Sequence, residues 1–359
     1  MLIRNNAPVF GANADPYPQR GEWQVSLSSR NLVSNDHYSG TVEQVQRQQL
    51  ENYVSNHQNL FDINVAHAVS RRVALSIGVP FVNSSWALRD PASPFPAPRQ
   101  EIPQHGRGIG DISVTSRAWI FDPQTHREWN VAAGAGIKLP TGNSRYQDMF
   151  IGRVDREEKL RYVDSSVQPG DGGWGLIMEG QAFWRVKRSF LFASGSYLAN
   201  PKDMNETPSI IVILGIPTVG QFAGLDVNSV PDQYVARVGG TVPVWKGFAA
   251  TGAWRVEGVK RYDLFGASHG WRRPGTEMFV EAGVSYSHGR NTVSFNVPFG
   301  YYYNRRPNPY TGIAGDATFP REIFLTSYSL RLGKQATSPG QPRRGVPPTP
   351  TDQTACPTP

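Results

Sequence analysis

Two sequence motifs decide the fold: Ile137-Lys138-Leu139-Pro140-Thr141-Gly142 and Gln168-Pro169-Gly170-Asp171-Gly172-Gly173-Trp174-Gly175. They bound a long polar segment with Pro and Gly at both ends, which is typical of a loop. Apolar residues alternate with other residues before it, over 129–139, and again after it, over 174–184. Alternation with period two predicts two strands that each have one apolar face. Trp residues at the ends of those faces are typical of a membrane interface.

The composition of the 359-residue chain favours a turn-rich β protein. Aromatic residues make up 11% and charged residues 18%, and Gly and Pro are abundant. No apolar run approaches the ~20 residues of a spanning helix, but strands escape this test because only alternate residues face lipid. The single cysteine, Cys356, excludes an internal disulfide framework. The net charge of +7 is scattered and forms no basic stripe of the kind that binds nucleic acid.

The strand pattern repeats along the chain about twelve times, with short turns and long loops in alternation. The predicted strands begin near Trp23, Phe61, Val73, Ile112, Trp129, Trp174, Phe190, Tyr234, Phe248, Met278, Val293 and Ile323. We therefore predict an all-β fold, a closed antiparallel transmembrane β-barrel of about 12 strands, with short periplasmic turns and long outer loops. Residues 1–20 form a flexible lead-in, 21–333 the barrel domain, and 334–359 a disordered Pro-rich tail.

Three loops carry expectations of their own. Residues 44–53 could form a short helix, and residues 90–108 read as a Pro-rich loop. The apolar segment 210–214 is a candidate for a loop folded into the barrel, a membrane-contacting lip or a short extra strand. The alternative fold is a soluble β-sandwich or propeller, in which the same apolar faces would form an internal core.

The polar strand faces are where function is expected. Their charged and amide residues, which we predict to line the lumen, are Asp62, Arg117, Lys138, Glu179, Gln181, Arg185, Arg237, Arg255, Glu257, Glu277 and Glu281. Inside a barrel, charges need partners or water. They could therefore pair into a ladder that stiffens the wall, or line a wet path and set its selectivity. A barrel of twelve strands is intermediate between filled and open barrels, so a narrow pore is the geometric expectation.

The Gly and Pro residues of the opening motifs have structural uses. Pro140 and Pro169 end strands because Pro cannot donate to the ladder, and the glycines permit tight turns. Asp171 could accept hydrogen bonds from its loop or help to hold a cation, although one carboxylate alone makes no calcium site.

Several motifs together resemble one family of outer-membrane barrels, labelled "MetA-pathway of phenol degradation" or simply transporter. They are Gly108-Ile109-Gly110-Asp111, Lys138-Leu139-Pro140-Thr141-Gly142, the Gln168–Gly175 motif, Gly270-Trp271-Arg272-Arg273-Pro274-Gly275, and Glu281 to Asn291. The resemblance covers most of residues 21–332. It implies a barrel that takes up aromatic or other small hydrophobic compounds, without identifying the solute.

Enzyme chemistry finds little support in the sequence. The seven histidines are scattered, and none lies in a metalloprotease or nucleophile-elbow motif. We expect no enzymatic activity, no cofactor, no metal and no nucleic-acid partner. The expected partners are the lipid bilayer of the bacterial outer membrane and a small solute, although residues 1–6 show no secretory signal. Two functions stay open: a passive channel, or a non-conducting structural or surface-binding barrel.

Overall fold

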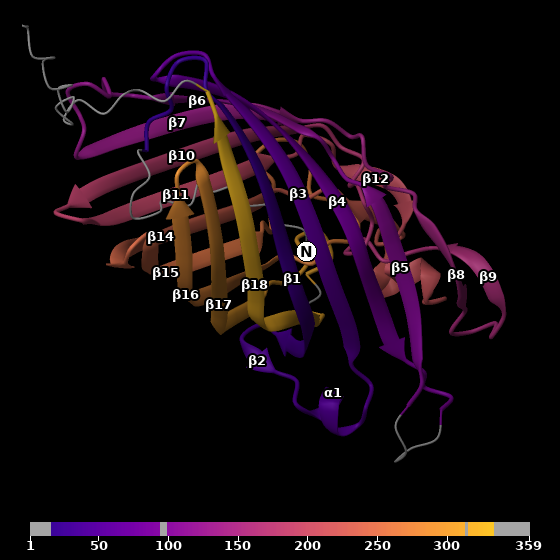
Figure 1. The fold of residues 1–359 in the computed structure, drawn as a ribbon. Helices are drawn as coiled ribbons and strands as arrows, with labels where there is room; N and C mark the ends of the chain where they lie inside the picture. The colour runs from indigo at the N-terminus through magenta and orange to yellow at the C-terminus, as the bar shows by residue number, and fades with distance from the viewer. Residues whose placement is uncertain (1–15, 94–98, 313–314, 334–359) are drawn as a thin grey trace, which may run out of the picture.

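The computed structural model describes residues 16–93, 99–312 and 315–333, and it is a closed antiparallel barrel (Figure 1). Going round the wall, the strands follow the order β18, β17, β16, β15, β14, β11, β10, β7, β6, β4, β3 and β1, and β1 pairs with β18 to close it. Their bounds are β1 Trp23–Ser39, β3 Val54–Ala68, β4 Val73–Arg89, β6 Ser113–Trp119, β7 Trp129–Lys138, β10 Gly175–Val186, β11 Ser189–Ala199, β14 Gln233–Trp245, β15 Phe248–Val259, β16 Gly275–His288, β17 Asn291–Arg305 and β18 Ala317–Leu332. The prediction of a twelve-stranded barrel is confirmed.

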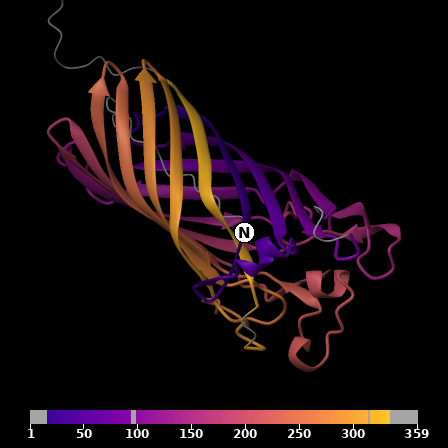
Figure 2. The same ribbon diagram turned by 90° about the horizontal axis from the view of Figure 1, so that it is seen from below.

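The remaining elements lie in or beside the long loops, which gather at one end of the barrel (Figure 2). They are β2 Val42–Glu43, α1 Gln46–Gln49, β5 Glu101–Ile109, β8 Gln147–Ile151, β9 Glu158–Tyr162, β12 Met204–Pro208, α2 Ile210–Ile213, η1 Gly220–Phe222 and β13 Val227–Ser229. The short helix predicted over 44–53 is confirmed as α1. No helix in the described ranges is long and apolar enough to cross a membrane.

The apolar strand faces point outward and remain exposed. Large exposed side chains of this band include Phe61, Leu75, Ile77, Val131, Leu191, Val238, Val280, Phe295 and Phe324. Burying so much apolar surface is the main driving force of folding in water, so an exposed band of this kind requires lipid around it. The soluble sandwich is therefore wrong, because its apolar faces would point inward.

One position in the wall is shared by two strands. The N-terminal part of β4, over 73–78, pairs with β6, and its C-terminal part, over 81–89, pairs with β5. The next strand, β7, pairs with β6 and not with β5. The predicted Pro-rich loop over 90–108 is thus partly wrong, since its second half forms β5. Residues near Val167 cover the inner face of β5 so closely that a Cβ on Gly106 would lie 1.8 Å from the carbonyl oxygen of Val167.

The interior is packed at two places. At the short-turn end, Tyr17 packs edge-on against Trp119 and Phe183, with Phe190 and Phe192 in the same cluster. Tyr17 thus ties the end of the predicted lead-in to the inner wall, and the earlier residues 1–15 lie outside the described part, as does the predicted tail with Cys356. On the opposite side of the barrel, Leu32 of β1, Phe279 of β16 and Ile323 of β18 form a second buried apolar cluster.

Candidate functional site

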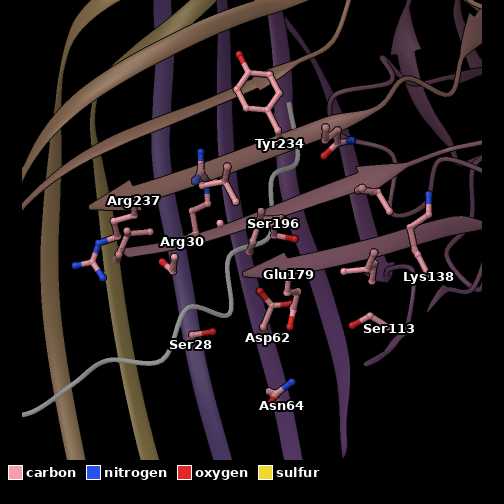
Figure 3. A pocket seen from close by; sticks show the side chains of 18 of the residues that line it. Ser28, Arg30, Asp62, Asn64, Ser113, Lys138, Glu179, Ser196, Tyr234 and Arg237 are labelled. Carbon is pink, nitrogen blue, oxygen red and sulfur yellow. The ribbon is translucent and has the colours of Figure 1, made fainter. Parts of the chain in front are cut away.

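A cavity of about 520 Å³ occupies the lumen. Its lining is rich in hydroxyl and amide side chains because the polar residues of each strand alternate with the outward apolar ones. Examples are Ser28, Asn64, Ser76, Thr115, Ser196 and Asn296. Charged side chains from several strands enter the same space, and Figure 3 shows Arg30, Asp62, Glu179, Lys138 and Arg237 among them.

One ion pair crosses the lumen. Arg30 lies on β1 and Glu257 on β15, and three other strands separate these two along the wall. The guanidinium of Arg30 donates to both carboxylate oxygens of Glu257, with 3.1 Å from Nη1 to Oε2. Such two-bond contacts fix geometry as well as charge. We call this pair the crossbar, because it spans the interior rather than following the wall.

Further charges surround the crossbar. Arg255 Nε donates to Glu257 Oε2 at 2.7 Å, so Glu257 holds two guanidinium groups. Arg237 Nε donates to Glu281 Oε2 at 3.0 Å, across β15. Glu277 lies beside Glu257 and is buried. The band therefore combines three arginines with three glutamates in a small buried volume.

A second charged group lies on the facing part of the wall. Arg117 on β6 donates to Glu179 at 3.1 Å and to Gln181 at 3.0 Å, both on β10. The strand between them, β7, places Gly134 directly between Arg117 and Glu179 in the register. A Cβ at Gly134 would lie 3.3 Å from the Glu179 carboxylate, so the small residue leaves room for this pair.

The two sequence motifs of the opening stretch meet at Lys138. The register aligns Lys138 with Ser113 on β6 and with Gly175 on β10, which brings Asp111 and Asp171 to its ammonium group. Lys138 donates to Asp171 and lies 3.8 Å from Asp111 Oδ2. Asp111 also accepts the backbone N–H groups of Gly142 and Asp171. The cation beside Asp171 is therefore a lysine of the same chain, and the cluster joins three loop ends.

The structure places most predicted site residues at the cavity. Those that line it are Asp62, Arg117, Lys138, Glu179, Gln181, Arg237, Arg255, Glu277 and Glu281. Glu257 is fully buried between its two arginines, and Arg185 instead lies over the ring of Phe190, 4.9 Å from its centroid, toward the short-turn end. Sequence reasoning missed Arg30 and Asp111. Arg30 could have been found only by continuing the inward register of the first strand past Leu27.

The long loops form a cap with its own buried polar network. Arg272 donates to Asp263 at 2.9 Å, and both side chains are fully buried. Arg273 pairs with Asp164, which also accepts from Ser166. Burial opposes ionisation of Asp164, but the Arg273 guanidinium and the Ser166 hydrogen bonds outweigh it and hold the pKa of Asp164 below its usual range.

The apolar segment 210–214 belongs to this cap. It begins with the helical turn α2, so the expectation of a short extra strand is wrong. Ile210 packs with Trp86, Val163 and Val167, and Trp271 lies against the same cluster. Trp271 also lines the cavity, so the cluster adjoins the loop end of the lumen.

Within the described ranges, no group of three or more His, Cys, Asp or Glu side chains could hold a metal ion. The charged side chains instead bind one another, mostly as arginine–carboxylate pairs. What this arrangement can do is bind and sort small polar or charged solutes at fixed charges.

A solved structure supports the barrel fold. An outer-membrane channel from Pseudomonas putida F1 matches over 90% of this chain and 100% of its own, with a TM-score of 0.59 and 9% identity. The translocator domain of autotransporter NalP from Neisseria meningitidis (89% and 91%, TM-score 0.42, 10% identity) and a Pseudomonas aeruginosa FadL homologue (87% and 90%, TM-score 0.38, 9% identity) are less similar. No protein-family model matches the chain, and no curated protein matches its sequence. With its exposed apolar band, the chain is a β-barrel of the bacterial outer membrane.

Proposed function

We propose that the chain is a passive outer-membrane channel for small solutes, without enzymatic activity, and that the crossbar is its selective constriction. The observation that carries this proposal is the lumen cavity of about 520 Å³, lined by polar side chains, with the Arg30–Glu257 pair at its border through Arg30. A barrel whose interior was filled by side chains would leave no such cavity. The predicted lumen residues then act as fixed charges along the path.

The solute class is part of the proposal. The resemblance to barrels of phenol degradation suggests small aromatic compounds. The apolar cluster around Trp86 and Ile210 adjoins the loop end of the lumen through Trp271, and hydroxyl and amide side chains follow it inside. That order suits an aromatic solute with one polar group, because its ring and its polar group would each find a matching surface.

Conductance of the full chain in planar bilayers tests the proposal. We expect open-channel current from the native chain. Glu257→Gln leaves Arg30 and Arg255 without their shared carboxylate and should shift selectivity toward anions. Arg237→Gln leaves Glu281 unneutralised and should shift it toward cations. One charge at a few ångströms in a wet pore is worth about 1 kcal/mol, so permeability ratios should change roughly fivefold.

Arg321→Gln is the matched control, because Arg321 pairs with Asp36 away from the cavity lining and its side chain is 72% exposed. It should leave the selectivity unchanged. Equal shifts in all three variants would contradict the constriction.

A non-conducting barrel is the second candidate, favoured by the mutual pairing of the interior charges and by Tyr17 at the short-turn end. A closed trace from the native chain at every voltage and salt concentration would leave this candidate in place of the channel.

A further inference from the structure

The short-turn end of the barrel is strongly basic. All five short turns carry at least one lysine or arginine, and the segment before β1 adds another. These residues, the basic rim, are exposed, and Arg72 also borders the lumen cavity: Arg20, Arg71, Arg72, Arg127, Lys187, Arg188, Lys246 and Arg290. In the described segments at this end the acids are Glu22, which faces Arg331, and Asp122 and Glu128, which share one connection. The rim is therefore a ring of positive charge.

The charges of the basic rim are not neutralised within the described part of the chain. None of its residues forms an ion pair there. Arg71 donates to the Gln19 side-chain oxygen at 3.0 Å, and Arg290 donates to the carbonyl oxygen of Gly333 at 2.7 Å. Arg72 likewise donates to a carbonyl, at 3.1 Å. Neutral acceptors orient these guanidinium groups and leave their charge for an external anion.

Tryptophans place the basic rim at the level of lipid headgroups. Trp23, Trp129, Trp184 and Trp245 are exposed on the outer surface, with exposed fractions of 43–67%. Each lies within three residues of a rim cation, and Trp245 is next to Lys246. Trp in such a belt sits at the interface between hydrocarbon and headgroups. The cations just beyond it therefore reach the depth of the lipid phosphates.

The cations are distributed around the whole circumference. They lie on the turns β3–β4, β6–β7, β10–β11, β14–β15 and β16–β17, which succeed one another around the wall (Figure 2). A protein partner would meet one sector of this ring, whereas the lipid annulus meets every sector. We propose that the basic rim binds anionic phospholipid headgroups, such as phosphatidylglycerol, in the periplasmic leaflet of the outer membrane.

Lipid selectivity of the full chain, reconstituted in phosphatidylcholine vesicles, tests this proposal. Spin-labelled phosphatidylglycerol and phosphatidylcholine are added in trace amounts, and the fraction of each that is immobilised on the barrel gives the ratio of their association constants. We expect a ratio of roughly two- to fourfold in favour of phosphatidylglycerol at low salt, falling as salt rises. Replacing Arg71, Arg72, Lys187, Arg188, Lys246 and Arg290 by Gln should bring the ratio close to one.

The control removes four exposed cations from the loop end, with Arg145, Arg153, Lys260 and Arg306 each replaced by Gln. This variant should keep the native ratio. Heat-modifiable migration on gels verifies that both variants are folded. A native ratio near one, or a native ratio that survives in the rim variant, would overturn the proposal.

Two half-rim variants separate a lipid annulus from a protein-binding sector. One replaces Arg71, Arg72 and Arg127 by Gln, and the other replaces Lys187, Arg188 and Lys246. An annulus predicts that each half removes a similar part of the lipid preference. Loss of the whole preference in one half and none in the other would overturn the annulus in favour of a localised site.

Discussion

The two ends of the barrel differ in how their cations are paired. In the loop cap, two arginines are matched to buried carboxylates: Arg272 pairs with Asp263, and Arg273 with Asp164, while other cations there, such as Arg153, are exposed. At the basic rim, cations such as Lys187 are exposed and find no carboxylate among the described residues. Buried charge must be paired because its desolvation is costly, whereas exposed charge remains hydrated at little cost. The difference indicates that the cap uses charge to hold its own shape and the rim presents charge to its surroundings.

The lumen combines features of both ends. Most of its arginines are paired with carboxylates as in the cap, but these pairs lie at the wall of a cavity. A pair at such a boundary can be structural and selective together, which is why the two uses predicted for the inward charges need not compete. Removing one partner should therefore affect stability and permeation in the same variant.

The largest expected effect is at the buried pair of the cap. Arg272→Gln leaves the Asp263 carboxylate buried with only the Asp232 backbone N–H and the Ser268 hydroxyl as donors. Breaking a buried pair in this way costs roughly 3–5 kcal/mol. Hydrogen exchange of the backbone amides in 260–274 should report that loss as faster opening of the cap. The double variant Arg272→Gln/Asp263→Asn should recover part of the lost stability. A loss below ~1 kcal/mol in Arg272→Gln would mean that the cap, like the rim, does not depend on its charges for stability.

A smaller effect is expected from acid. Because the folded-state pKa of Asp164 is lowered, its ionised form contributes stability above the unfolded pKa of about 3.9, and this contribution is lost as pH falls through the folded pKa. Cleavage of the cap by pepsin should accordingly accelerate below about pH 4. Arg273→Gln removes the main cause of the lowered pKa and should flatten that dependence. An identical pH profile in the variant would show that other acids set the acid sensitivity.

The sequence predicted the barrel well because strand alternation is a local pattern. The register that brings Asp111 and Asp171 to Lys138 is not local, since it depends on how β6, β7 and β10 align. The same holds for Arg30, whose partner Glu257 lies across the lumen rather than on a neighbouring strand. Local pattern therefore predicts which residues face inward, and only the closed fold determines which of them pair.

The strand β5 escaped prediction for a different reason. Its segment contains Pro103, Gly106 and Gly108, which are typical of a loop. Two of these residues serve the cap instead, because Val167 approaches Gly106 and Pro169 lies against Gly108. Pro and Gly lower the strand propensity of this segment, and the glycines allow close packing from inside the barrel. Tertiary contacts of this kind leave no periodic signal in a single sequence.

The smallest expected effect is at the basic rim. Lys187→Gln/Arg188→Gln should change the free energy of unfolding by less than ~0.5 kcal/mol in a zwitterionic detergent, because neither cation has an ion-pair partner in the described chain. Gln preserves the turn, since it meets the same left-handed backbone requirement that Lys187 meets at φ 57°. Urea unfolding followed by tryptophan fluorescence measures the difference. A loss comparable to that of Arg272→Gln would mean that the rim charges stabilise the barrel itself, and the contrast between the two ends would then lie in exposure alone.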